Sequence, residues 1–285
     1  MMNKLIIYIL VILACSGCRK IVETDLDIVE KPVIECFLSP QDTEIKLRLY
    51  RPRVLGVTGP LELEGLAISD AEVRIQKVGG ESLNLTFDGE SNEYTAAVTA
   101  QFLVHTNSYQ LFINHPDYED VRAETRIPEP VRNLRFAIDS IPAGFVNDYF
   151  GRIQWERTDS LSYHRSFIAV EGNFGVEFQF PAYSDSGNNP DYLKLEDGQV
   201  SEVAFPEVSF QEDSDPNTFG RLSLKGDSVF YKGLNIDKNY YEYHLDLRQA
   251  DRADDLADPV IIFSNIENGY GIFCSYAIEE GKTTL

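Results

Sequence analysis

Four cysteines are the side chains whose spacing points most clearly to a definite chemistry. Cys15 and Cys18 follow a basic start at Lys4 and an apolar run over residues 5–14. A basic start and a short apolar core are typical of a secretory signal peptide, and the run is shorter than the roughly twenty residues that span a bilayer. Small residues directly before a cysteine are typical of a lipoprotein signal. We therefore expect a mature chain that is anchored to a membrane by an acylated, palmitate-bearing cysteine.

Either of two cysteines could receive the lipid. Cys15 has the better preceding residues, because the signal peptidase prefers an aliphatic residue three positions before the cut and Ile12 stands there. Cys18 is preceded by small residues, Ser16 and Gly17, but has a poor residue at the third position. The residues alone leave both candidates open.

Cys36 and Cys274 lie in the body of the chain. Export would place them in an oxidising compartment, where a disulfide is permitted. A bond between them requires the two ends of the chain to meet, since Cys36 lies in an early strand and Cys274 in the last apolar segment. The alternative is two separate buried thiols that each behave as a small hydrophobic side chain.

Motifs for catalysis are missing from the sequence. It contains no hydrolase nucleophile elbow, phosphate loop, zinc spacing or dinucleotide fingerprint. We expect neither enzymatic activity nor a cofactor. A hydrolase is the alternative, and a carboxylate pair such as Glu171 and Glu177 would need the separation that a glycosidase requires. The histidines are scattered without a partner at motif spacing: His105, His115, His164 and His244.

The acidic segment 185–191 is the best candidate for a metal site. Asp185, Asn188 and Asp191 could supply the oxygen ligands that calcium prefers on a turning loop. The segment lacks the spacing and the terminal glutamate of the helix–loop–helix calcium site. A solvated loop is therefore favoured, and we expect no metal.

Composition indicates a folded, β-rich and acidic protein. A hydrophobic content of 43% excludes a disordered chain, and 15 Tyr with 17 Phe favour pleated sheets. The net charge of −21 argues against nucleic-acid binding, which needs clustered cations.

The strand patterns predict two domains. An acidic tether over residues 19–30 precedes a domain over 31–130, whose count of short strands is typical of an immunoglobulin-like or transthyretin-like β-sandwich. Pro128 and Pro130 end it, because prolines cannot continue a strand ladder. The predicted strands are 33–38, 44–50, 71–78, 83–87, 93–98, 108–113 and 120–127.

A second β-rich domain is predicted over 131–285. Tyr241, His244 and Arg248 have helical spacing and predict one substantial helix near 238–252. The predicted strands are 151–156, segments of 163–180 and a buried strand over 260–263, with loops over 182–227.

The segment Ser264-Asn265-Ile266-Glu267-Asn268-Gly269-Tyr270-Gly271-Ile272-Phe273 carries a family resemblance. After Pro259 and the predicted helix, it resembles the closing signature of an outer-membrane lipoprotein family of Bacteroidota, domain of unknown function 4249. Its glycines permit unusual backbone angles or close approaches, and Asn265 and Asn268 can hold a turn. We therefore predict a structural role for Asn265, Asn268, Gly269 and Gly271.

The resemblance implies an accessory or interaction subunit of a TonB-dependent transporter, a β-barrel of the outer membrane. It would be lipid-anchored, non-catalytic and exposed on the cell surface rather than facing the periplasm. The alternative is a direct glycan- or peptide-binding lipoprotein, whose aromatic residues would stack on the ligand: Phe174, Phe178, Phe180 and Tyr183.

Three further expectations depend on the resemblance. Relatives tend to carry glycine where Cys36 and Cys274 stand, which favours a bond between them. In relatives the acidic tether closely follows the lipidated residue, which favours Cys18 and a signal segment over residues 1–18. Bacteroidota O-glycosylate Asp-Ser-aliphatic tripeptides, and three serines fit this pattern: Ser140, Ser160 and Ser228.

Overall fold

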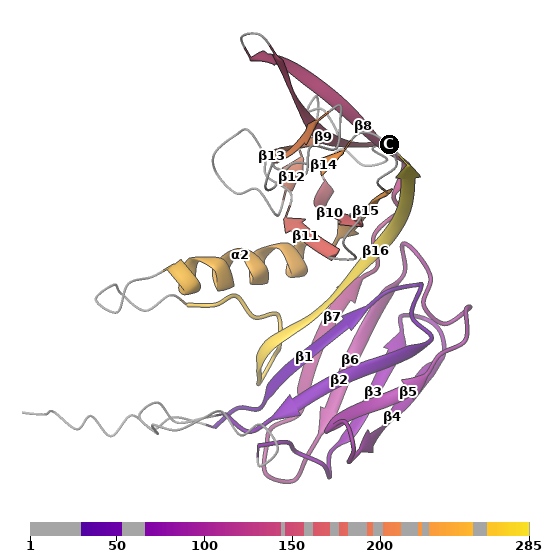
Figure 1. Ribbon diagram of the computed structural model, residues 1–285. Helices are drawn as coiled ribbons and strands as arrows, with labels where there is room; N and C mark the ends of the chain where they lie inside the picture. Colours follow the sequence, from indigo (N-terminus) through magenta and orange to yellow (C-terminus); the bar gives the residue numbers. More distant parts are fainter. Residues whose placement is uncertain are drawn as a thin grey trace, which may run out of the picture. The chain divides into compact units, whose positions relative to one another are not determined.

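The chain is mainly β-structure, as its sequence predicts (Figure 1). The computed structural model describes residues 30–52, 66–143, 146–156, 162–171, 177–181, 193–195, 202–211, 222–223, 228–252 and 261–284. Lys31–Leu285 forms one compact unit.

Seven strands at the start of this unit form an immunoglobulin-like sandwich. One layer has the order β1-β2-β5-β4 and the other the order β3-β6-β7, which are the A-B-E-D and C-F-G sheets of that fold. The first half of β4 pairs with β3 and the second half with β5, so this strand passes from one layer to the other. The strands are β1 (Val33–Leu38), β2 (Glu44–Tyr50), β3 (Glu72–Lys77), β4 (Ser82–Asp88), β5 (Glu93–Ala97), β6 (Ser108–Asn114) and β7 (Val121–Arg126).

Alternation along each strand fills the sandwich. β1 buries Ile34, Cys36 and Leu38 and turns the residues between them outward. Tyr109, near the start of β6, donates a hydrogen bond from its hydroxyl to the carbonyl of Phe102, at 2.6 Å. This upstream bond has the form of the tyrosine corner of immunoglobulin-like sandwiches. The strand order and this bond are consistent with the sandwich predicted for this segment.

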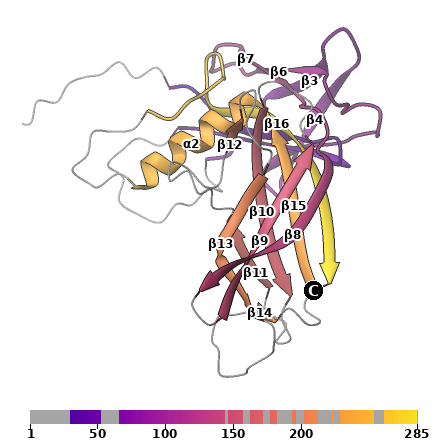
Figure 2. The same cartoon turned by 90° about the horizontal axis from the view of Figure 1, so that it is seen from above.

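Some of the remaining strands continue the sheet beyond β1, and the others form a second sheet. β16 pairs in parallel with β1 and antiparallel with β15, and β15 pairs with β10 (Figure 2). A separate sheet has the order β14-β13-β9-β8. The strands are β8 (Arg132–Ala143), β9 (Val146–Glu156), β10 (Ser162–Glu171), β11 (Glu177–Pro181), β12 (Leu193–Leu195), β13 (Glu202–Gln211), β14 (Leu222–Ser223), β15 (Ser228–Ile236) and β16 (Tyr270–Thr284).

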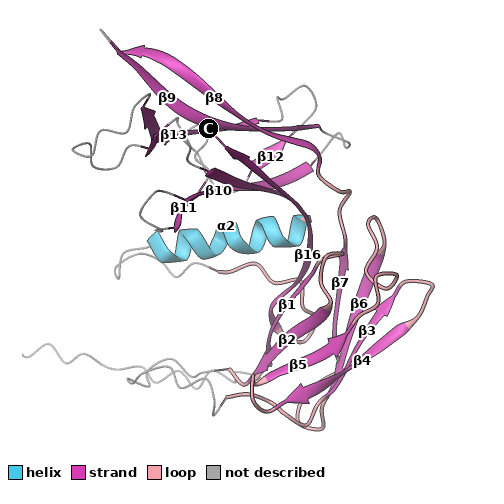
Figure 3. Cartoon of the chain, turned by 45° about the vertical axis from the view of Figure 1, so that its right-hand side comes forward, coloured by secondary structure: helices cyan, strands magenta, loops and turns pink. Residues whose placement is uncertain are grey.

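Helix α2 (Lys238–Arg252) is the helix that the sequence predicts, and it packs beside β16 (Figure 3). Asp237 caps its start, since its Oδ1 accepts a hydrogen bond from the backbone N–H of Tyr240 at 2.8 Å. Tyr240 and the partly buried Tyr241 and Tyr243 join Ile272 and Cys274 of β16 in one apolar cluster. The helix thereby covers the outer face of β16.

The C-terminal segment differs from its prediction in two places. Residues 261–266 form no strand, and Ile261 is 90% exposed, so the predicted buried strand over 260–263 is wrong for its described part. The last strand is instead β16, and the predicted loop region contains β12, β13 and β14. The division of the chain into two domains at residue 130 stays a prediction.

The predicted disulfide between Cys36 and Cys274 is wrong, although the strands that carry the two cysteines do pair. Both thiols are free and buried on the paired strands β1 and β16. Cys36 lies opposite Phe273 and faces the sandwich core, whereas Cys274 lies opposite Phe37 and faces the cluster under α2. Because the thiols point to opposite faces of the sheet, they cannot bond.

Candidate functional site

The segment 265–268 covers the edge of β7, the last strand in the sheet order of the described residues. Glu267 exchanges two backbone hydrogen bonds with Arg122 of β7, at 2.8 and 3.3 Å. Nearby, the amide group of Asn265 donates to the carbonyl of Glu124, and that of Asn268 donates to the carbonyl of Asp120. Unpaired edge strands expose hydrogen-bonding groups that can pair with other chains. This segment blocks the edge.

Residues 269–275 cover the opposite edge of the sandwich, at β1. The side chain of Asn265 links the two parts, because it accepts from the N–H of Phe273 at 3.0 Å and donates to the carbonyl of the same residue at 2.7 Å. Gly271 has φ +98°, and a Cβ at this position would overlap the carbonyl oxygen of Ile34. Gly269 is also crowded, by Ile266 and Ile34.

The closing signature therefore joins the first and last strands of the sandwich, β1 and β7. We call residues 265–275 the seam. Its asparagines satisfy backbone groups and its glycines allow close backbone approach, in agreement with the structural role predicted for them. A ligand contact is not needed to explain these residues.

We expect Asn265→Ala to lower the free energy of unfolding by about 2–3 kcal/mol, because it removes three side-chain hydrogen bonds at roughly 1 kcal/mol each. Urea unfolding of the variant tests this. Asn84→Ala, at an exposed asparagine of β4, is the control and should change the free energy by no more than about 0.5 kcal/mol. Equal effects of the two substitutions would contradict the role given to the seam.

A buried polar junction joins β7, β16 and the start of α2. The hydroxyl of Thr125 donates to the carboxylate of Asp237 and lies 2.9 Å from the hydroxyl of Ser275. The backbone N–H of Asp237 donates to the carbonyl of Ser275 at 3.0 Å. The residue Asp237 as a whole is half-buried, but its carboxylate is enclosed by these hydrogen-bonding groups. Burial raises the pKa of Asp237 to about 6, against the opposing effect of its hydrogen bonds, led by the one from Thr125.

His164 is enclosed and serves packing. Its ring stacks on Trp155 with 3.6 Å between ring centroids, and its nitrogens lie 3.2 Å from Asn235 Oδ1 and 2.8 Å from Ser166 Oγ. Burial lowers the pKa of His164 to about 3, so the ring is neutral at physiological pH. Sequence reasoning missed both this stack and the junction, because their members are far apart in the chain.

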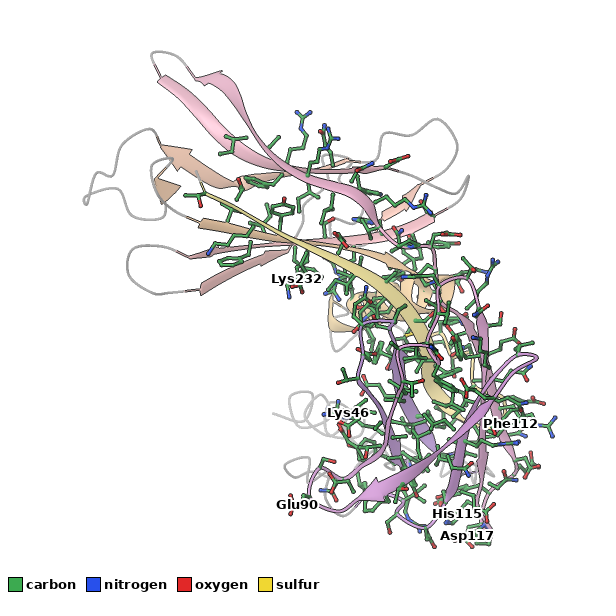
Figure 4. The ribbon with its side chains drawn as sticks, turned by 90° about the vertical axis from the view of Figure 1, so that its right-hand side faces the viewer. Lys46, Glu90, Phe112, His115, Asp117 and Lys232 are labelled. Carbon is green, nitrogen blue, oxygen red and sulfur yellow. The ribbon has the colours of Figure 1, made fainter. Side chains whose placement is uncertain are left out.

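A groove of about 330 Å³ lies on the outer face of β1 and β2, beside the cluster that α2 covers. Outward-facing residues of both strands line it, together with Glu93 of β5 and Tyr276 of β16. Figure 4 shows Lys46, which lines the groove, on the opposite side of the sandwich from Phe112 of β6. The full lining is Glu35, Phe37, Asp42, Glu44, Lys46, Arg48, Glu93 and Tyr276.

Residues 20–282 match the model of the family described as "Domain of unknown function (DUF4249)". The chain belongs to this family. The match begins two residues after Cys18, and it contains the sandwich, the junction and the whole seam. The family predicted from the closing signature is therefore confirmed.

Outside this family, the likeness of the chain to solved structures is low. No curated protein matches the sequence. A tetra-tandem repeat in the extending region of a large adhesion protein is 8% identical with a TM-score of 0.20, over 88% of this chain and 49% of that one. Dimeric latent PorU from Porphyromonas gingivalis is 11% identical with a TM-score of 0.19, over 73% of this chain and 19% of that one. The DUF4249 chain thus spans less than half of either protein.

Several predicted sites of this DUF4249 chain lie outside the described residues. These are the lipid-attachment candidates Cys15 and Cys18, the metal candidates Asp185, Asn188 and Asp191, Ser160, Phe174 and Tyr183. Ser140 and Ser228 belong to β8 and β15, and Glu171, Glu177, Phe178 and Phe180 to β10 and β11, but their side chains also lie outside the described part. The described residues contain no cluster of three or more metal-ligating side chains and no helix with the length and apolar content of a membrane span.

Proposed function

We propose that the protein is a lipid-anchored lipoprotein of the outer membrane that acts as a non-catalytic accessory subunit of a TonB-dependent transporter. The observation that carries the proposal is the leader, in which an apolar run over residues 5–14 ends at Cys15 and Cys18. The family match starts at residue 20. A domain that begins directly after the cysteines is consistent with a leader that is removed and a chain that is held by its new first residue.

The buried titratable groups of the described residues favour a structural role over a catalytic one. Two groups with strongly shifted pKa values that could transfer protons, His164 and Asp237, both bind neighbouring strands through side-chain hydrogen bonds. Neither lines the groove on the outer face. Their arrangement is that of groups which hold a scaffold together.

Purification from native membranes tests the proposal. The full chain with an affinity tag after Leu285 would be extracted in mild detergent, and the proteins that co-purify would be identified and quantified. We expect a β-barrel of the TonB-dependent class in roughly equal amount. A Cys15→Ser/Cys18→Ser double variant is the control, because it lacks both candidate anchors and should lose the barrel with the membrane. Recovery of the wild-type chain alone, or with unrelated membrane proteins only, would contradict the proposal.

A further inference from the structure

The walls of the groove come from strands β1, β2, β5 and β16 and from the turn between β1 and β2. The outward residues of β1 supply Glu35 and Phe37, and those of β2 supply charged side chains. β16 contributes Tyr276, while Asp42 comes from the turn between β1 and β2. The side chains that face away from the groove, such as Cys36, fill the sandwich core.

Both cations of the groove are already paired. The guanidinium of Arg48 contacts Glu93 at 2.8 Å and Glu35 at 3.1 Å, so a carboxylate lies on either side of it. The ammonium of Lys46 lies 3.6 Å from the carboxylate of Glu44. An anionic ligand would have to displace these carboxylates, which makes an anion site unfavourable.

Asp42 differs from the other carboxylates of the groove. Its Oδ2 accepts a hydrogen bond from the backbone N–H of Ser39 at 2.8 Å, and no salt bridge to it is found among the described residues. Burial raises its pKa, which indicates a carboxylate that water solvates poorly. The negative charge of Asp42 also contributes to raising the pKa of Tyr276 to about 12, after the larger effect of burial. The carboxylate and the phenol ring line the same groove.

Two aromatic rings line the groove together with this carboxylate, and both pack against helix α2. Phe37 makes an edge contact with Tyr240 of α2, with 5.7 Å between ring centroids, and Tyr276 makes a similar contact at 6.2 Å. Both rings are half-buried and line the groove. A carboxylate beside aromatic rings is the combination that recognises an ammonium or guanidinium group, through an ion pair and cation–π attraction.

We propose that this groove binds a lysine or arginine side chain of a peptide partner, with Asp42 as its counter-ion and Phe37 and Tyr276 against its aliphatic stem. Complementarity of charge supports this occupant, since four carboxylates and two cations line the groove. The cation of the ligand would pair with Asp42, which is the carboxylate of the groove that has no ionic partner among the described residues. This binding site is independent of the lipid anchor and of any transporter.

Calorimetric titration of the full chain in non-ionic detergent micelles with a trilysine peptide tests the assignment. We expect saturable binding of one peptide per chain. Trilysine with its side chains and its N-terminus acetylated should not bind, because it lacks the ammonium groups. The Asp42→Asn variant should bind trilysine at least roughly tenfold more weakly, the loss expected for one charge-assisted interaction.

Two checks separate the site from general attraction to an acidic protein. Glu90→Gln removes one negative charge from the exposed turn between β4 and β5 and should change the dissociation constant less than about twofold. The side-chain amide that Asp42→Asn introduces can still accept from the backbone N–H of Ser39, so unfolding temperature and circular dichroism should match the wild type. The proposal is overturned if the wild type shows no saturable binding, if Asp42→Asn binds as well as the wild type, or if Glu90→Gln weakens binding equally.

Discussion

Gly271→Ala is expected to lower the free energy of unfolding by at least about 3 kcal/mol, or to prevent folding altogether. Two costs add at this position. The residue has φ +98°, a conformation that side chains disfavour, and a Cβ would overlap the carbonyl oxygen of Ile34 on the paired strand β1. The strands would have to separate at the seam, which joins β1 and β7. Urea unfolding, or the yield of folded protein, measures the effect.

Substitutions at two other glycines distinguish the cost of the positive φ from the cost of the steric overlap. Gly79→Ala shares the positive φ, +74°, but no atom lies within 4 Å of the added Cβ, so only about 1–2 kcal/mol should be lost. Gly89→Ala has neither feature and should be close to neutral. If Gly271→Ala cost no more than Gly79→Ala, the close contact between β16 and β1 would be absent and the account of the seam would be wrong.

The second large effect concerns pH. A carboxyl whose pKa is higher in the folded than in the unfolded chain binds its proton more tightly when folded, so its contribution to stability increases as pH falls. For Asp237 this pH interval lies between a pKa of about 6 in the folded protein and the ordinary value of 3.8. The difference between the two pKa values corresponds to up to about 3 kcal/mol of folding free energy. Asp237→Asn should remove this dependence and keep the helix cap, because asparagine caps helices as well as aspartate does.

Chemical unfolding of wild type and Asp237→Asn at intervals from pH 8 to pH 4 measures this contribution. The stability of the wild type relative to the variant should rise as pH falls through the interval. His164 and His244 titrate in both proteins, so their contributions cancel in the difference. Asp117→Asn, at an exposed turn residue, should run parallel to the wild type. If the difference in free energy of unfolding between wild type and Asp237→Asn were constant across this pH range, the pKa of Asp237 would not be raised in the folded protein.

The sandwich could be predicted because its signals are local. The alternation in Glu44–Tyr50 and the pattern of Val33–Leu38 define β1 and β2 with their observed bounds, and the other strands of the sandwich agree within two residues. α2 was predictable for the same reason, since its spacing is contained in fifteen residues. Turns and prolines between these segments limited each element to a short range.

Contacts between distant segments were not predictable. Nothing local indicates that β16 pairs in parallel with β1, and without that register the opposite orientation of Cys36 and Cys274 cannot be deduced. The apolar run before the signature looked like a buried strand, yet Ile261 is exposed. The groove likewise combines β1, β2, β5 and β16, whose outward residues appear in the sequence only as ordinary exposed positions of alternating strands.

The intact mass of the protein extracted from its native membranes tests the central proposal most directly. We expect a chain that has lost the residues before Cys18 and carries acyl lipid on that cysteine, and a Cys18→Ser variant that keeps its leader and gains no lipid. O-glycans on Ser140, Ser160 or Ser228 would appear as additional, separable mass. A chain that still begins at Met1, or one that is cut without gaining lipid, would contradict the anchored lipoprotein.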